Sequence, residues 1–214
     1  MSRIRRRKWA RPELEKDPKV IFQPQEYQGK WPELFKNQNP IHLELGCGQG
    51  EFISQCAENN PHLNFIAIDL YNEVLVQTLR KLNENSLENV RLIPMNIRLI
   101  NEIFAEDEVA KIYINFCNPW PKRRHHIRRL THPVFLEKYK KFLINKGEVC
   151  FKTDDDGLFQ DSLKYFAESG FKELYKTFDL HSSSYAQNNI VTKYEEKFSS
   201  QGIKIKFGIF QNNK

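Results

Sequence analysis

Long apolar runs and paired cysteines are what this sequence lacks. None of its 214 residues belong to an apolar run of the roughly 20 residues that a helix needs to cross a bilayer. The four cysteines are widely spaced and form no CxxC pair; they stand at positions 47, 56, 117 and 150. This spacing argues against a disulfide framework and against a zinc site, so we expect reduced cysteines, no metal and a cytoplasmic protein.

Acidic residues are missing from two segments that are dense in cations. Six cations lie between Arg3 and Arg11, before the first acid, and five more lie between Lys122 and Arg129. Without these eleven cations the chain has 22 basic and 27 acidic residues, so its net charge of +6 becomes −5. A cation excess confined to two segments indicates a polyanionic partner such as nucleic acid.

The same two segments argue against a membrane partner. The N-terminal cations are not followed by the apolar segment that an export signal requires. Neither segment has the apolar face of a helix that lies on a membrane surface. We therefore expect no membrane partner.

The length fits one domain preceded by an arm. Residues 1–40 begin with cations and are interrupted by five prolines. We expect residues 1–40 to be a basic N-terminal arm and lead-in, with helical turns only near Glu13 and Trp31, and residues 41–214 to form the domain. A flexible tail is the alternative for the arm.

Strand-like and helix-like patterns alternate through the domain. The predicted strands are 41–45, 64–68, 90–94, 109–117, 148–152, 171–180 and 203–210, and the predicted helices are 51–59, 71–84, 131–145 and 157–169. A polar loop is expected from 181 to 198. This alternation predicts an α/β fold of the Rossmann-like type, with a seven-stranded, mostly parallel sheet, helices on both faces and a final hairpin-like pair.

A glycine-rich loop follows the first predicted strand. The loop reads Gly46-Cys47-Gly48-Gln49-Gly50 and opens into a helix, which is the first unit of a nucleotide-binding fold. Glu51 stands where a dinucleotide fingerprint requires glycine, and Glu44 would repel a pyrophosphate. A cationic cofactor is therefore favoured over a nicotinamide. A plain turn without a ligand remains the alternative.

Two polar residues follow the next two strands. Asp69 comes 19 residues after Gly50, where an acid accepts hydrogen bonds from ribose hydroxyls. Asn96 follows the third strand. Each residue could instead cap the helix that follows it, but their shared spacing with the glycine loop favours a cofactor site.

The densest functional signal runs from Val109 to Arg129. A buried strand leads into Asn118-Pro119-Trp120-Pro121, where the prolines enforce a stiff turn, and the cation run follows at once. A rigid aromatic beside cations suits a site that stacks a base and holds phosphates. Ligands in open α/β sheets lie outside the carboxyl ends of the strands, so we expect this turn and the glycine loop to meet in one crevice. A buried tryptophan under a solvated basic loop is the alternative.

Four motifs together resemble one family over nearly the whole chain. They are ELGCGQG at 44–50, NFCNPWPKRRH at 115–125, FKTD at 151–154 and TKYEEKF at 192–198. The first is shared with many class I methyltransferases, whereas the PWPK-R-H run is specific to the bacterial tRNA (guanine-N7-)-methyltransferases that the chain resembles. The resemblance implies a class I methyltransferase fold, S-adenosyl-L-methionine as cofactor, and methylation of guanine 46 in the variable loop of tRNA. We expect a monomer or a homodimer.

The resemblance also assigns residues to roles. The cofactor would contact Glu44, Gly46, Gly48, Asp69, Asn96 and Asn118, of which Asn118 would be catalytic. The tRNA would contact Lys122, Arg124, His125, Arg128, Arg129, Asp154, Thr192, Lys193, Tyr194 and Glu195. Positions 96 and 118 are commonly aspartate in the family and are asparagine here. This departure bears on the rate and on cofactor affinity more than on the fold.

The chemistry can be weighed from the nucleobase alone. Guanine N7 carries a free lone pair and no proton, so its methylation needs no general base. The protein must desolvate N7, align it with the methyl group and tolerate the charge that develops on the purine. Two alternatives keep the same fold. One is a tRNA-binding protein that has lost catalysis through the two asparagines, and the other is an amino-group methyltransferase, whose N-P-P-aromatic turn Asn118-Pro119-Trp120 resembles.

Overall fold

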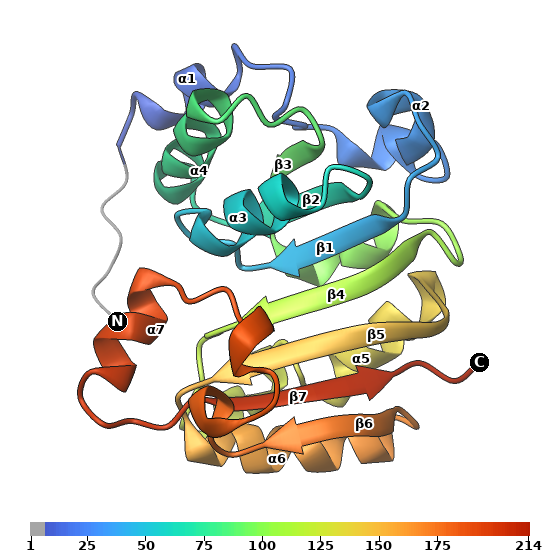
Figure 1. Ribbon diagram of the computed structural model, residues 1–214. Helices are drawn as coiled ribbons and strands as arrows, with labels where there is room; N and C mark the ends of the chain where they lie inside the picture. Colours follow the sequence, from blue (N-terminus) through green and yellow to red (C-terminus); the bar gives the residue numbers. More distant parts are fainter. Residues whose placement is uncertain (1–6) are drawn as a thin grey trace. The chain divides into compact units, whose positions relative to one another are not determined.

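The computed structural model describes residues 7–214, and the chain divides into two compact units (Figure 1). Unit 1 is Met1–Phe104 and unit 2 is Ala105–Lys214. Arg3, Arg5 and Arg6 of the predicted basic arm lie outside the described residues.

Unit 1 is built on three parallel strands. They are β1 (Ile41–Leu45), β2 (Asn64–Asp69) and β3 (Val90–Pro94), ordered β3-β2-β1. Their residues are almost all buried, as expected of parallel strands covered on both faces. The three strands confirm the predicted positions and end together at the edge where the glycine loop begins.

Two helices cover the strands of unit 1, and both were predicted. They are α3 (Glu51–Asn59) and α4 (Asn72–Glu84), each of which packs on β2. The apolar stripe of α4 is buried, from Leu75 to Leu82. This is the helical periodicity visible in the sequence. A short 3-10 helix, η2 (Ile97–Glu102), follows β3.

Residues 7–40 are attached to unit 1. The helical turns expected near Glu13 and Trp31 are α1 (Ala10–Leu14) and α2 (Trp31–Phe35), with the 3-10 helix η1 (Pro24–Tyr27) between them. The Ile21 amide donates to the Leu92 carbonyl over 2.8 Å, and the buried Trp31 indole donates to the Ile103 carbonyl over 2.9 Å. These contacts do not fit the flexible-tail alternative within residues 7–40.

Unit 2 contains four strands in the order β4-β5-β7-β6. They are β4 (Val109–Asn115), β5 (Leu143–Thr153), β6 (Lys172–Thr177) and β7 (Lys206–Gln211). β4 and β5 are parallel, whereas β7 is antiparallel to both β5 and β6. All seven predicted strands are therefore present, and the final hairpin-like pair is confirmed.

Helices α5 (Pro133–Phe142) and α6 (Asp156–Glu168) pack on the strands of unit 2, where Figure 1 shows them behind the sheet. A third helix, α7 (Lys193–Ser199), and the 3-10 helices η3 (Arg123–Arg128), η4 (Leu180–Ser182) and η5 (Ala186–Asn188) complete the unit. Throughout residues 7–214, every helix is too short or too polar to traverse a bilayer.

Several predicted boundaries in unit 2 were wrong, each for a local reason. β4 ends two residues early because Phe116 adopts a φ of 51°, which a strand cannot continue. The helix predicted to Asn145 ends at Phe142, and β5 starts there with an irregular pairing before Lys146, whose φ is 62°. The strand predicted for 171–180 spans only 172–177.

The predicted polar loop from 181 to 198 contains a helix instead. α7 begins after Thr192, whose hydroxyl accepts a hydrogen bond from the Glu195 amide over 3.2 Å. This is the N-cap half of a capping box, which permits a short helix in a polar segment. The last strand starts at Lys206, three residues later than predicted.

Candidate active site

The glycine loop of unit 1 has three residues with positive φ. The values are 81° for Gly46, 54° for Gly48 and 75° for Gly50. A Cβ atom at Gly50 would lie 2.4 Å from Cγ2 of Thr78, whereas nothing lies within 4 Å of a Cβ at Gly46 or Gly48. Gly50 is therefore required for packing against α4, and the other two glycines leave room for a ligand beside the backbone.

The loop is held in place through its own main-chain amide and carbonyl groups. The Gly46 amide donates to the Ile68 carbonyl at the end of β2 over 2.8 Å. On the other side, the Thr78 hydroxyl of α4 donates to the Gly48 carbonyl over 2.9 Å, and Lys81 Nζ donates to the Gln49 carbonyl over 2.9 Å. The loop is thus anchored between the neighbouring strand and helix without using its own side chains.

Asp69 lies at the end of β2 and joins the loop to α4. One carboxylate oxygen accepts from the Gly48 amide over 3.1 Å and the other from the Tyr71 amide over 3.0 Å. Burial nevertheless raises the pKa of Asp69, because it outweighs the stabilising effect of these hydrogen bonds. The carboxylate therefore supports the loop. This supporting role was not predicted from the sequence.

Glu44 and Asp69 surround one thiol. Glu44 is only 2% exposed although it carries a carboxyl group. The pKa of Cys47 is raised well above its usual value, first by burial and then by the carboxylates of Asp69 and Glu44. Two carboxyl groups beside a glycine loop form a site that suits a cationic amino acid and a ribose diol, so these residues fit S-adenosyl-L-methionine.

Asn96 occupies the position of a helix cap. Its side-chain oxygen accepts a hydrogen bond from the Arg98 amide over 3.0 Å at the start of η2. The capping alternative is therefore realised in the structure. Contact with a cofactor remains a prediction for this residue.

In unit 2, Asn118 begins the predicted stiff turn. Its side-chain oxygen accepts from the Trp120 amide over 3.1 Å, and Trp120 has a φ of 43°. Behind the turn, Arg129 Nε donates to the Pro119 carbonyl over 2.7 Å, and Nη1 lies 2.6 Å from Oδ2 of Asp161 on α6. Arg129 is 4% exposed and faces inward, so the prediction that it contacts RNA does not fit its position.

The remaining cations of this run face solvent. Lys122, Arg124 and Arg128 are exposed, and the guanidinium of Arg128 lies 5.0 Å from the centre of the Trp120 ring. Desolvation, reinforced by the three neighbouring cations, lowers the pKa of His125. These residues form a positive surface, with Trp120 beneath Arg128.

Asp154, Phe116 and Tyr194 gather at the carboxyl ends of β4 and β5. The rings of Phe116 and Tyr194 are 5.0 Å apart. Burial and then the carboxylates of Asp154 and Asp155 raise the pKa of Tyr194, and burial followed by Asp155 raises that of Asp154. Lys193, the first residue of α7, is exposed. An aromatic ring can stack on a nucleobase, and a carboxylate can accept hydrogen bonds from its edge.

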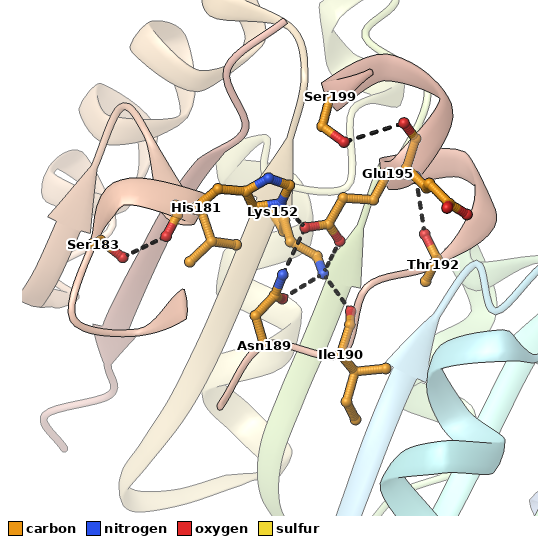
Figure 2. Close-up of polar contacts among 10 residues, drawn as sticks. Lys152, His181, Ser183, Asn189, Ile190, Thr192, Glu195 and Ser199 are labelled. Carbon is orange, nitrogen blue, oxygen red and sulfur yellow. Dashed lines mark hydrogen bonds and ion pairs between the residues drawn. The ribbon is translucent and has the colours of Figure 1, made fainter. Parts of the chain in front are cut away.

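The side chains of Glu195 and Thr192 form hydrogen bonds and ion pairs within unit 2 (Figure 2). Glu195 is 0% exposed, and Oε2 lies 2.6 Å from Nζ of Lys152 while Oε1 lies 2.7 Å from Nε2 of His181. Thr192 caps α7. The predicted direct contact of these two side chains with tRNA therefore does not fit their positions.

The structure brings the predicted residues together as two groups. Glu44, the glycine loop and Asp69 meet in unit 1, and Asp154 and Tyr194 meet in unit 2 beside Phe116, two residues before Asn118. The predicted common crevice stays a prediction. Sequence reasoning missed Lys152, although a lysine inside the apolar run of β5 signals a buried partner. Over the described residues no cluster of three or more candidate ligands could hold a metal ion, and all four cysteines are free thiols.

Comparisons with known proteins agree with this geometry. Residues 38–207 match a family model described as "Putative methyltransferase". The tRNA (guanine-N(7)-)-methyltransferase of Desulfitobacterium hafniense is 66% identical over 99% of both chains. That of Clostridium tetani is 58% identical over 96% of this chain and 97% of its own.

Solved structures with low sequence identity support the fold. The 16S rRNA methyltransferase KamB has a TM-score of 0.65 at 11% identity and covers 87% of this chain and 94% of its own. A geranyl diphosphate C-methyltransferase from Streptomyces coelicolor, in complex with S-adenosyl-L-homocysteine, has a TM-score of 0.56 at 14% identity over 81% and 70% of the two chains. At these identities the likeness establishes a Rossmann-like methyltransferase fold.

Proposed function

Because the chain belongs to the bacterial tRNA (guanine-N7-)-methyltransferase family, we propose that it methylates N7 of guanine 46 in the variable loop of tRNA, with S-adenosyl-L-methionine as donor. The observation that carries this proposal is 66% identity over 99% of the chain to a protein of that name. We place the activity in the cytoplasm, in a monomer or a homodimer. Residues 41–214 would form the catalytic domain and residues 1–40 its basic arm.

Unit 1 supplies the cofactor site in this proposal. Gly46 and Gly48 leave space beside the main chain, and Glu44 and Asp69 provide two carboxyl groups next to it. Glu44 would face the cationic amino-acid end of the cofactor, and Asp69 would accept hydrogen bonds from the ribose. Asn96 would face the adenine while it caps η2. When bound, the cofactor supplies a methyl group on a sulfonium ion.

Unit 2 supplies the guanine site. Tyr194 offers a ring for stacking, and Asp154 offers a carboxylate that can accept hydrogen bonds from the amino and imino groups of the guanine edge. Tyr194 lies beside Phe116, where the chain leaves β4 towards Asn118. This arrangement would leave N7, on the opposite edge of the base, available to react.

Asn118 would act by hydrogen bonding and not as a base. N7 already presents a lone pair, so no proton has to be removed. The amide can orient the guanine or the methyl donor, but it lacks the negative charge that would stabilise the developing purine cation. We therefore expect turnover with asparagine at this position, at a rate below that of an aspartate variant.

The exposed cations would hold the tRNA backbone. Lys122, Arg124, His125, Arg128 and Lys193 are accessible to phosphates or sugars, and Arg128 lies over the ring of Trp120. Arg129, Thr192 and Glu195 would contribute by positioning, because their polar groups are already engaged within unit 2.

Nucleoside analysis tests this proposal. The protein is incubated with methyl-labelled S-adenosyl-L-methionine and unmodified tRNA transcripts, in which guanine 46 is retained or replaced by adenine. The proposal predicts label in 7-methylguanosine only when guanine 46 is present. Label in a methylated amine would identify an amino-group methyltransferase, and tight tRNA binding without label would identify a binding protein that has lost catalysis.

A further inference from the structure

A buried lysine lies at the centre of the polar contacts in unit 2 (Figure 2). Lys152, in β5, is 3% exposed, and its ammonium group has three acceptors within 3.0 Å. These are Oδ1 of Asn189 at 2.9 Å, the Ile190 carbonyl at 3.0 Å and Oε2 of Glu195 at 2.6 Å. An ammonium has three N–H donors, so its hydrogen-bonding capacity is filled by partners from a single segment of chain.

The acceptors are also joined to one another. Asn189 Nδ2 donates to Oε1 of Glu195 over 2.6 Å, which closes a ring of Lys152, Asn189 and Glu195. His181 Nε2 lies 2.7 Å from the same oxygen. Each buried polar group therefore has a partner, which is the condition under which a buried ionic network orders a structure. The ring ties the segment from 181 to 199 to the central strand of the unit.

The same lysine contacts the turn that leaves β4. Its carbonyl accepts from the Phe116 amide over 2.8 Å, and its Nζ lies 5.4 Å from the centre of the Phe116 ring. The same ring also contacts Tyr194, the residue before Glu195, with the two ring centres 5.0 Å apart. Lys152 thus links the start of the Asn118 turn to the first turn of α7.

We propose that Lys152 is a positioning residue that holds Tyr194 next to Asp154 in the geometry that receives the guanine. Glu195 is its counter-ion, at 2.6 Å. This inference rests on the proposed function. α7 has seven residues, too few to be stable as an isolated helix, so its position depends on such anchors.

Replacement of Lys152 tests the proposal, because a positioning residue should affect the methylation rate more than the affinity for tRNA or cofactor. Lys152→Met keeps the length of the side chain and leaves Glu195 buried without its cation, and we expect the single-turnover rate for bound tRNA to fall by roughly a hundredfold. Affinity for tRNA and for S-adenosyl-L-methionine should change less than about threefold, because the exposed cations and unit 1 are untouched. A merely destabilised protein would lose both affinities along with the rate.

Lys111→Met is the matched control. Lys111 also lies in the sheet of unit 2, on β4, and pairs with Glu148 of β5 over 2.8 Å. It should keep the native rate. Asn189→Ala is a milder variant, which opens the ring without removing a charge. We expect Asn189→Ala to slow the reaction by about fivefold, so it can test the proposal if Lys152→Met is too unstable to purify.

A double variant distinguishes the loss of an anchor from an unpaired buried charge. Lys152→Met with Glu195→Gln removes both charges but still lacks the ammonium that joins β5 to α7, so we expect the rate to stay at least about tenfold below native. A native rate in the double variant would mean that Lys152 only neutralises Glu195, and the proposal would be overturned.

Hydrogen exchange separates failure of this inference from failure of the proposed function. Amides from 189 to 199 should exchange faster in Lys152→Met than in the native protein, while those of β1 to β3 should not change. Native protein that methylates no tRNA guanine would refute the function and leave this exchange result standing. Native rate and native exchange in Lys152→Met would refute the positioning role.

Discussion

The two halves of the candidate site are held in place by different means. In unit 1, the glycine loop is fixed by main-chain groups, by Thr78 and by Asp69, and its strained φ angles are tolerated because the residues are glycines. In unit 2, the turn at Asn118 and helix α7 are held by the buried cations Arg129 and Lys152. Unit 1 is therefore sensitive to the volume of side chains, and unit 2 to the removal of a charge.

The comparison suggests how each half tolerates change. The glycine loop needs residues without a Cβ at its positive φ angles, and several separate hydrogen bonds to its main chain share the task of holding it. A turn held by a buried cation needs every partner of that cation, since an unpaired buried charge is costly. Four variants and one rate measurement separate the two cases, from the largest expected effect to the smallest.

Gly50→Ala should have the largest effect on stability. Its φ is 75°, and the new Cβ would meet Thr78 at 2.4 Å. We expect the free energy of unfolding to fall by about 4 kcal/mol, from the left-handed backbone together with the overpacked contact. Gly46→Ala is the control: it has positive φ but open space, and should cost about 1–2 kcal/mol. Equal losses in denaturant titrations would show that packing against α4 is not what Gly50 provides.

Arg129→Met should destabilise unit 2 by about 3 kcal/mol. The substitution leaves the Pro119 carbonyl without its donor and Asp161 without its cation. Arg128→Met, at the neighbouring exposed position, should cost less than about 0.5 kcal/mol. Thermal unfolding of both variants measures the difference. Similar melting temperatures would place Arg129 among the solvated cations.

Asp69→Ala should weaken binding of S-adenosyl-L-methionine by about 1–3 kcal/mol. The variant loses the expected acceptor for the ribose and the two hydrogen bonds that hold Gly48 and Tyr71. Calorimetric titration measures the affinity, with Glu173→Ala, in an exposed ion pair of unit 2, as a control that should bind the cofactor normally. Native affinity in Asp69→Ala would remove this residue from the cofactor site.

Arg128→Gln should have the smallest effect, confined to the salt dependence of tRNA binding. The loss of one phosphate contact flattens the slope of log affinity against log salt by roughly one unit. Arg11→Gln offers a comparison on the arm, where Arg11 already pairs with Glu15 over 2.7 Å. A slope unchanged by Arg128→Gln would mean that this residue does not face the RNA.

Most of unit 1 could be predicted from the sequence because its signals are local. β1, the glycine loop and α3 follow one another within 19 residues, and the glycines themselves mark the strained backbone. Asp69 was predicted as a cofactor residue from its spacing after the loop, and that role stays a prediction. That its carboxylate also holds the Gly48 amide could not be predicted, since this contact depends on how β2 packs beside the loop.

Unit 2 was less predictable because its contacts join distant residues. Lys152 is bonded to Asn189 and Glu195, which lie 37 and 43 residues away, and nothing in the local pattern identifies those partners. Arg129 ends a run of exposed cations and cannot be told from them by composition. α7 had a visible signal, since Thr192 and Glu195 have the spacing of a capping box, but its polar sequence resembled a loop.

The central claim is that methyl transfer to an unprotonated N7 proceeds with an amide at position 118. Single-turnover methylation of unmodified tRNA by native protein, Asn118→Asp and Asn118→Ala tests it most directly. We predict measurable turnover by the native protein, a rate roughly tenfold to a thousandfold higher for Asn118→Asp because a charge is added beside the developing cation, and a lower rate for Asn118→Ala. No turnover by the native protein alongside rapid turnover by Asn118→Asp would contradict the claim and identify a tRNA-binding protein without catalysis.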